Sequence, residues 1–439
     1  MASSGHFPLR SSLSDVAQWT GVAAVRPLQA LITQPSLVFL CTLAVMLLRP
    51  PDVQFYALDR IAFVLLAFVV LLRALLLQQP LPAAGLVTWP MLGLLLLAFA
   101  GVVGQPYEAQ TWSVFAAKWV VPFVLYHLAG LAFEDDVSRR RFETFALITL
   151  AYLSFTAIAF LLGLKEFVFP RFILDESVGI HADRARGPFL QAVANGVTLN
   201  LLGLMALDAY RRRRLRGALG LAFLATLPLA ILATRTRAVW LSFAGSILLL
   251  LLRSSSACMR RVCLGLVLAG ATGLLLAMSF GNTSALSDRL AEQGPLDYRV
   301  SVYDAGRQMF LEKPLVGWGA SQVQPELAKR ISGFRVEAFF FHNTYLEIAV
   351  EHGLLGLGLY LWMVIDLFRI GRRRPSDWSR AFPDRAFRSL WPIMVLVYLV
   401  NASFVGMNYQ FVNGFLFTLA GILAAQNRRS ELQGDVLPN

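Results

Sequence analysis

The chain has 439 residues, of which 57% are hydrophobic and only 15% are charged, a balance that excludes an ordinary soluble globular protein. The net charge of +12 could suggest a nucleic-acid-binding protein. We exclude that class because the basic residues gather in short loops beside apolar segments, where they orient membrane helices.

Twelve apolar segments have about the length that a helix needs to cross a hydrocarbon core of ~30 Å. They cover residues 36–49, 59–77, 85–104, 113–133, 143–163, 188–209, 216–233, 236–252, 260–280, 344–370, 389–405 and 410–427. The sequence therefore predicts an all-α polytopic membrane protein. Residues 1–280 would form spans one to nine, 281–343 a helical loop outside the membrane, and 344–439 the last three spans and a tail.

Clusters of arginine lie between alternate spans and fix the expected orientation. The clusters are at 139–141, 211–216, 253–261, 372–388 and 428–429. All of them fall on one side of the predicted layout, which the positive-inside rule makes the cytoplasmic side. Both termini are then cytoplasmic, and the two long loops, 164–187 and 281–343, lie on the outer side.

The first long outer loop ends in a basic segment that precedes an apolar span. Pro188 suits the first position of a helix, so Arg184 and Arg186 would lie just ahead of a helix N-terminus. Free backbone N–H groups and guanidinium groups at such a place favour a phosphate or another anion. The alternative is that both arginines contact lipid headgroups at the interface.

A short outer turn between two spans carries Arg235 and Arg237, against the usual charge bias. Charge at the membrane boundary must be paired, reach the headgroups or line a wet cavity. Arg237 could begin the following span and point into a cavity, or it could extend to the headgroups. For Arg235 we favour the headgroups.

The second long outer loop contains two expected helices, at 295–312 and at 322–332. In the first helix an apolar face recurs with helical spacing, at Tyr298, Val302, Ala305 and Met309. Arg299 lies off that face and is a candidate anion ligand; the alternative is a solvated helix face. We expect this loop to form a helical cap over the membrane cavity.

The tenth span is expected to begin at Thr344, because Thr344 and Glu347 have the spacing of a capping box. His342 then lies just outside the membrane helix. A neutral imidazole there could accept a proton from a hydroxyl group, although a lone histidine is more often structural. Glu347 and Glu351 share a helix face, and Glu351, inside the span, needs a partner, for which we expect an arginine.

In chain order, the outer-side motifs resemble those of the O-antigen ligase and O-antigen polymerase superfamily, which also contains pilin O-oligosaccharyltransferases. The motifs are Arg186-Gly-Pro-Phe, Thr236-Arg-Ala, Asp297-Tyr-Arg, Pro314-Leu-Val-Gly-Trp-Gly, His342-Asn-Thr-Tyr-Leu-Glu and Glu351-His-Gly-Leu-Leu-Gly. They cover about residues 184–360. The usual pattern has Ser-Arg at the hairpin, where this chain has Thr236-Arg237.

The resemblance implies a GT-C-like glycosyltransferase with its active site facing the periplasm. It would move a glycan from undecaprenyl diphosphate to lipid A–core in the bacterial inner membrane, without a metal or another cofactor, by inverting transfer. The essential residues of the family map to the catalytic set Arg186, Arg237, Arg299 and His342. We expect substrate contacts from Arg184, Asn343, Glu347 and Glu351.

Two other functions remain open at this stage. A polymerase or a protein O-oligosaccharyltransferase would use the same donor and the same fold, with a different acceptor. A polysaccharide transporter or flippase would also suit twelve spans, but would more often show internal repeats and broken helices near the midplane. The sequence predicts neither the sugar, the linkage, the donor length nor the oligomeric state.

Overall fold

The computed structural model describes residues 32–51, 55, 57–79, 84–254, 256–280, 294–331, 339–372 and 382–434. Every regular element in these ranges is a helix. The predicted outer loop 281–343 is therefore described only in part, and some of the arginines of the predicted 372–388 cluster lie outside the described residues.

A helix lies at each of the twelve predicted spans. The helices are α3 (Pro35–Leu48), α4 (Leu58–Leu76), α5 (Thr88–Val103), α6 (Ala109–Phe115) with the π-turn η2 (Ala116–Val120) and α7 (Val121–Ala132), α8 (Asp136–Leu161), α9 (Ala192–Arg211), α10 (Gly217–Ala233), α11 (Arg237–Arg253), α12 (Ala257–Phe280), α16 (Thr344–Arg372), α17 (Phe387–Ala402) and α18 (Gln410–Gly434).

Among the described residues, four helices are both long and apolar enough to cross a membrane: Ala109–Ala132, Asp136–Leu161, Ala192–Arg211 and Thr344–Arg372. Four apolar helices are shorter, at Pro35–Leu48, Thr88–Val103, Gly217–Ala233 and Phe387–Ala402. The described residues are thus all helical or irregular, and their long apolar helices are consistent with the predicted polytopic membrane protein.

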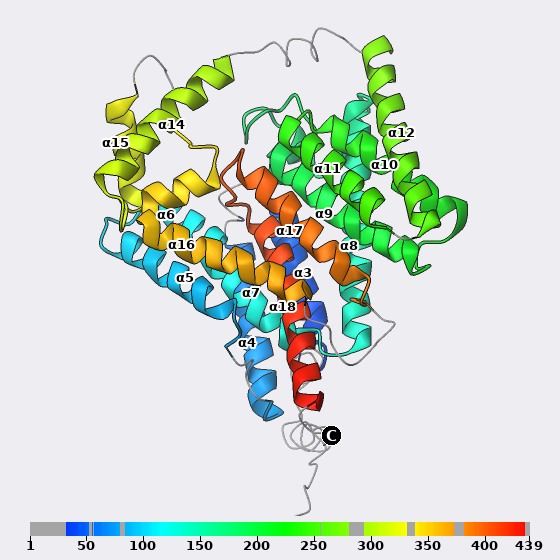
Figure 1. Ribbon diagram of the computed structural model, residues 1–439, viewed down its shortest axis with the longest axis horizontal. Coiled ribbons are helices and arrows are strands. Elements are labelled where there is room, and N and C mark those ends of the chain that lie inside the picture. Colours follow the sequence, from blue (N-terminus) through cyan, green and yellow to red (C-terminus); the bar gives the residue numbers. More distant parts are fainter. Residues whose placement is uncertain are drawn as a thin grey trace, which may run out of the picture.

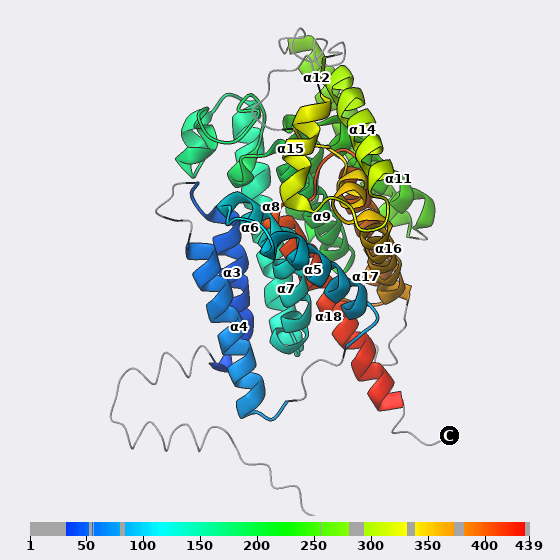
Figure 2. The ribbon, with the colours of Figure 1, turned by 90° about the vertical axis from the view of Figure 1, so that its left-hand side faces the viewer.

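The helices form a bundle with two distinct ends (Figure 1 and Figure 2). One end, here called the loop end, carries α14 (Gly294–Glu312), α15 (Ala320–Arg330) and the segment 162–191 with its short 3₁₀ turns η3 (Lys165–Phe167), η4 (Arg171–Leu174) and η5 (Gly187–Phe189). The opposite end, here called the tail end, carries the last turns of α18. The orientation inferred from the sequence makes the loop end the outer one.

The centre of the bundle is α9, which is buried along nearly its whole length. Close contact between α7 and α18 depends on Gly421, where an added Cβ would lie 2.1 Å from the carbonyl oxygen of Tyr126. Stacked rings of Phe142 and Phe415, with centroids 5.3 Å apart, pack α8 against α18. Small residues and stacked rings therefore set the helix spacing in this part of the core.

Periodicity predicted the two loop helices correctly, to within about two residues. Val302, Ala305 and Met309 are buried, and Tyr298 is half-buried beside them. Their cluster includes Leu327 of α15 and residues at the start of α16. The cap is therefore a small hydrophobic unit that is anchored on α16.

Helix α16 is interrupted at Gly353, whose φ of 64° and ψ of −162° are open to glycine alone. Glycines spaced along a membrane helix, as at 353, 356 and 358, often allow close helix packing. Instead, Gly353 breaks the helix, and segment 314–319 pairs with the freed backbone groups. The hydrogen bonds run from Trp318 N to Val350 O, Gly319 N to Glu351 O, Leu354 N to Pro314 O and Leu355 N to Leu315 O.

Both partners of this contact require glycine. A Cβ at Gly353 would lie 2.3 Å from the backbone of Leu315, and one at Gly317 would lie 2.5 Å from the backbone of Glu351. Backbone groups in an apolar surrounding must be satisfied internally, and the paired segment does so at the break. Two motifs that are forty residues apart in the sequence thus form one backbone unit.

Candidate active site

At the loop end, His342 lies on the turn that leads into α16. Its backbone is left-handed, with φ of 49°, a conformation in which histidine is tolerated better than most residues. Tyr298 of α14 contacts the imidazole edge to face, with ring centroids 6.2 Å apart, and its hydroxyl accepts a hydrogen bond from Phe340 N at 3.1 Å. The cap helix therefore holds the histidine turn in place.

The imidazole of His342 has two charged neighbours of opposite sign. Burial lowers the pKa of His342 below its ordinary value, and Arg299 of α14 lowers it further, whereas Glu347 acts in the opposite direction. At neutral pH the imidazole is therefore mainly uncharged and can accept a proton. The structure thus brings together two of the predicted catalytic residues, His342 and Arg299.

The first turn of α16 is capped differently from the prediction. Asn343, rather than Thr344, is the N-cap: its side-chain oxygen accepts hydrogen bonds from the N–H groups of Tyr345 and Leu346 at 3.0 and 3.1 Å. The Thr344 hydroxyl instead donates to Val405 O at 2.8 Å. Asn343 was expected to contact substrate, but its oxygen is engaged in this cap.

Glu347 and Glu351 have a partner that the sequence analysis did not identify. Both carboxylates accept hydrogen bonds from the ammonium group of Lys118, at 2.8 and 3.2 Å. The expected partner was an arginine, and the expected role of Glu347 was a helix cap. No local signal could have identified Lys118, because it is 229 residues from Glu347 in the chain.

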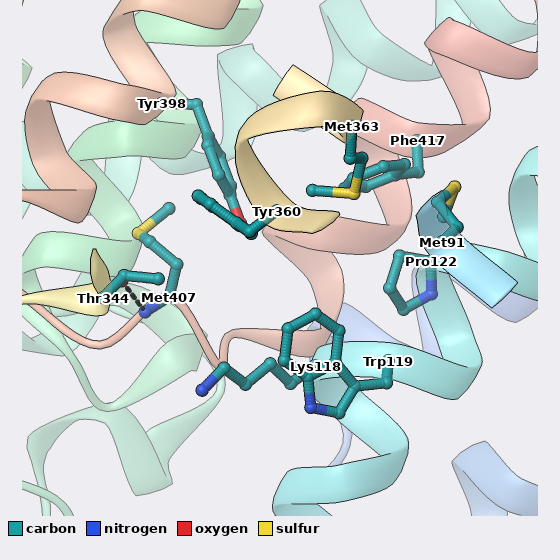
Figure 3. A pocket seen from close by; sticks show the side chains of 10 residues that line it. All are labelled: Met91, Lys118, Trp119, Pro122, Thr344, Tyr360, Met363, Tyr398, Met407 and Phe417. Carbon is teal, nitrogen blue, oxygen red and sulfur yellow. Dashed lines mark hydrogen bonds between the residues drawn. The ribbon is translucent and has the colours of Figure 1, made fainter. Parts of the chain in front are cut away.

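Lys118 lies in the π-turn η2 and is 7% exposed. With Trp119 and Thr344 it borders a narrow pocket beneath the histidine turn (Figure 3). Pro122 of α7, Met407 ahead of α18, and aromatic and methionine side chains from α5, α16, α17 and α18 line the rest of this pocket. π-turns inside α-helices occur often at functional sites, and here the turn points a lysine at two carboxylates.

A second group of predicted residues lies around the turn between α10 and α11. Ala185 N donates to Ala233 O at 3.1 Å, and Arg235 donates to Asp183 O at 3.3 Å, so segment 183–186 is tied to this turn. Arg237 is the first residue of α11, at the predicted start of that span, and its side chain is exposed. Among the described residues it makes no hydrogen bond or ion pair.

Arg184 belongs to this second group. It is 7% exposed, and its Nε lies 3.8 Å from a carboxylate oxygen of the neighbouring Asp183. That Nε has no hydrogen-bond partner within the described ranges. A buried guanidinium with an unsatisfied N–H can donate a hydrogen bond to an additional anion or carbonyl oxygen.

Arg186 has a different environment from the one predicted. It is 1% exposed, and its guanidinium donates to the carbonyl oxygens of Ile173 at 2.9 Å, Val178 at 2.6 Å, and Asp175. Arg186 is the N-cap of the short 3₁₀ turn η5, which contains Pro188, and α9 begins only at Ala192, so Arg186 precedes a 3₁₀ turn rather than a membrane helix. In this structure Arg186 organises the loop 173–178 from within.

The loop end therefore presents two groups, His342 with Arg299 on α14 and α16, and Arg184 with Arg237 beside α11. Helix α17 lies between the two sides of the bundle that carry them (Figure 1). Helix α17 contacts α11 through Asn401, whose side-chain amide donates to the Ser242 hydroxyl at 2.9 Å. On the other side, Val405 O, in the segment after α17, accepts the hydrogen bond from the Thr344 hydroxyl of α16. Within the described residues, no cluster of three or more histidine, cysteine, aspartate or glutamate side chains could hold a metal ion.

Comparison with known proteins supports the resemblance drawn from the motifs. No curated protein matches the chain. A family model does match residues 219–361, which include Arg237, Arg299, His342, Glu347 and Glu351. That model is described as O-antigen ligase, so residues 219–361 of the chain are similar to this family.

Proposed function

We propose that this protein is an O-antigen ligase that transfers a glycan from undecaprenyl diphosphate to lipid A–core on the periplasmic side of the bacterial inner membrane. One observation supports this proposal most strongly. At the loop end, a half-buried neutral histidine lies close to an arginine that has no carboxylate partner among the described residues. This arrangement offers a base and an anion ligand at one place, as transfer from a diphosphate requires.

The arginines would act on the donor. Arg237 and Arg299 would bind the diphosphate and stabilise the negative charge that grows on it as it leaves, and Arg184 would add a contact from the neighbouring segment. Arginine suits this task because its planar fork binds phosphate oxygens in pairs and stays charged. The proposal assigns charge neutralisation to these residues rather than to a divalent cation. Arg186 would act indirectly, by holding the loop beside them.

His342 would act on the acceptor. Its free ring nitrogen would take the proton of the acceptor hydroxyl as the hydroxyl oxygen bonds to the anomeric carbon. The bond from that carbon to the diphosphate oxygen would break at the same time, and the diphosphate would leave with the electron pair. Attack from the face opposite the leaving group would invert the anomeric configuration.

The layout expected from the sequence completes this proposal. Twelve spans in a GT-C-like arrangement, with both termini cytoplasmic, would place the loop end in the periplasm. The exposed apolar side chains of the bundle would contact membrane lipids, and the polyprenyl tail of the donor would lie among them. The polymerases of the same family would share this donor site and differ in the acceptor.

A reconstituted reaction tests the proposal. Purified protein, lipid-linked glycan and lipid A–core are combined in detergent with EDTA, and the product is separated by gel electrophoresis. We expect glycan on lipid A–core, with inverted anomeric configuration. Extension of one lipid-linked glycan by another would show a polymerase instead, and loss of turnover in EDTA would overturn the assignment of charge neutralisation to arginine.

A deletion strain separates the enzyme from a transporter. A ligase deletion should remove the lipopolysaccharide ladder and leave lipid-linked polymer in the outer leaflet. Donor held in the inner leaflet would indicate a flippase. The interruption of α16 at Gly353 makes this control necessary, because broken helices are frequent in transporters.

A further inference from the structure

The buried lysine beneath the histidine turn has no role in the transfer as described so far. It lies on a different part of the chain from the family match, in η2 at residues 116–120. Its ammonium group nevertheless contacts the first two turns of α16, which follow directly after His342. We propose that Lys118 is a positioning residue of the active site, which keeps Glu347 ionised and fixed beside His342. This inference rests on the proposed function.

The distances distinguish the two carboxylates. Lys118 Nζ lies 2.8 Å from Glu347 Oε1, which is the length of a charge-assisted hydrogen bond, and 3.2 Å from Glu351 Oε2. The other oxygen of Glu347 is directed at Gly406, where an added Cβ would lie 2.7 Å from it. Glu347 is therefore held from two sides, by an ammonium group and by a backbone that leaves room only for glycine.

An ammonium group in an apolar interior needs a compensating anion, and a buried carboxylate needs a cation. Here one lysine faces two carboxylates, so the cluster carries one excess negative charge if both are ionised. Removal of Lys118 would leave a half-buried and a buried carboxylate one helical turn apart, and such a like-charged pair favours the uptake of a proton. Glu347 would then lose the charge that acts on His342.

The chemical value of that charge follows from the proton transfer. Before the reaction His342 must be neutral, and Arg299 favours this state. As the proton arrives, the imidazole becomes a cation, and an ionised carboxylate nearby stabilises that cation, as the aspartate does in a serine protease triad. Arg299 thus favours the neutral imidazole before proton transfer, and Glu347 stabilises the imidazolium after it. Lys118 maintains the effect of Glu347 by keeping that carboxylate ionised.

Other charged and titratable groups surround this cluster. Arg299 and Tyr298 of α14 face His342, while Glu347 has as further neighbours Glu351, His352 and Tyr360 of α16, Tyr398 of α17 and Tyr409 before α18. His352 Nε2 lies 3.6 Å from Glu351 Oε2. Within this set, Lys118 is the one lysine that hydrogen-bonds Glu347.

Two variants of Lys118 and one of Glu347 test the inference. Lys118→Met keeps the length of the side chain and removes the charge, and Lys118→Arg keeps the charge. Glu347→Gln removes the carboxylate charge and leaves Lys118 with Glu351, so it folds even if Lys118→Met does not. Transfer is measured per folded molecule, with kcat and KM for the donor determined separately, from pH 5 to pH 9.

We expect Lys118→Met and Glu347→Gln to lower kcat about 10–100-fold, less than the ~10²–10⁴-fold typical of a general base itself, with little change in KM. The acidic limb of the pH profile should move to lower pH in both, because His342 loses the neighbour that raises its pKa. In Lys118→Arg the acidic limb of the pH profile should stay at the wild-type pH. Lys329→Met, the same change on the exposed face of α15, is the matched control and should match wild type.

A second measurement does not depend on transfer. Diethyl pyrocarbonate modifies neutral imidazole, and peptide mass spectrometry locates the product at His342. The midpoint of modification against pH should fall in Lys118→Met and Glu347→Gln and stay in Lys118→Arg. An unchanged midpoint with an unchanged pH profile would overturn the inference. Failure of the wild-type protein to transfer glycan, with the midpoint shifted as expected, would overturn the proposed function alone.

Discussion

Several arginines at the two ends of the bundle differ in their partners, although Arg330 of α15 also forms ion pairs at the loop end, with Glu312 and Glu326. At the tail end, Arg212 forms ion pairs with Glu143 of α8 and Asp208 of α9, and Arg211 joins Asp208 to Asp384 ahead of α17. At the loop end, Arg237 and Arg299 have no ion pair among the described residues. The positive-inside pattern explains the number of tail-end arginines, but only the structure shows that buried carboxylates neutralise several of them.

This contrast distinguishes arginines that stabilise the fold from arginines that are available to bind an anion. Glu143 and Asp208 are both fully buried, so their arginine partners hold three segments of the bundle together. An arginine at the loop end without a counter-ion has its positive charge available for an anion from outside. We therefore expect substitutions at the tail end to change stability, and those at the loop end to change transfer.

The largest expected effect is at the tail end. Arg212→Met leaves the Glu143 carboxylate buried with Arg214 as its remaining cation, at 3.6 Å. Loss of one partner of a buried ion pair costs about 3–5 kcal/mol, so thermal unfolding in detergent should occur at a clearly lower temperature. Transfer per folded molecule should remain at the wild-type level. Arg140→Met, at an exposed tail-end position, is the control and should unfold like wild type.

The next largest effect is at the loop end. Arg237→Ala and Arg299→Ala should each lower transfer by about 10²–10³-fold, the usual loss when one group that stabilises a developing anion is removed. Their unfolding temperatures should stay close to wild type. Arg307→Ala is the matched control on α14, because Arg307 is exposed and lies two turns from Arg299. Full transfer activity in either variant would remove that residue from the proposed diphosphate site.

Local patterns predicted the parts of this molecule that depend on local physics. The apolar face at Val302, Ala305 and Met309 follows from helical periodicity, and the start of α16 at Thr344 follows from capping signals. The family match confirms the resemblance carried by the motifs within residues 219–361. In these cases neighbouring residues in the sequence determine the outcome.

The predictions that differ from the structure involve contacts between distant segments. The sequence contains no sign that Arg186 would donate to three carbonyl oxygens, or that Lys118 would contact Glu347. The break at Gly353 was missed for the same reason, since the segment that pairs with it lies some forty residues earlier. Composition and spacing describe which groups are available, whereas tertiary packing decides which of them remain free.

A smaller effect, on proteolysis of the loop 164–187, tests the structural role of Arg186. Arg186→Lys keeps the charge but provides fewer and differently placed donors than the fork that now binds Ile173, Asp175 and Val178. Unsatisfied buried carbonyl groups cost about 1–3 kcal/mol, so we expect faster proteolysis within residues 164–187. If Arg186 instead bound the diphosphate directly, Arg186→Lys would raise KM for the donor and leave the proteolysis rate unchanged.

The smallest expected effect concerns the pH response of the histidine. Arg299 lowers the pKa of His342, so Arg299→Gln should raise that pKa and move the midpoint of diethyl pyrocarbonate modification to higher pH. Lys118→Met should move the same midpoint to lower pH, because it removes the opposing influence of Glu347. Arg307→Gln, on the exposed part of α14, should leave the midpoint unchanged. Shifts of opposite sign from the two variants would show that His342 lies between two opposed charges.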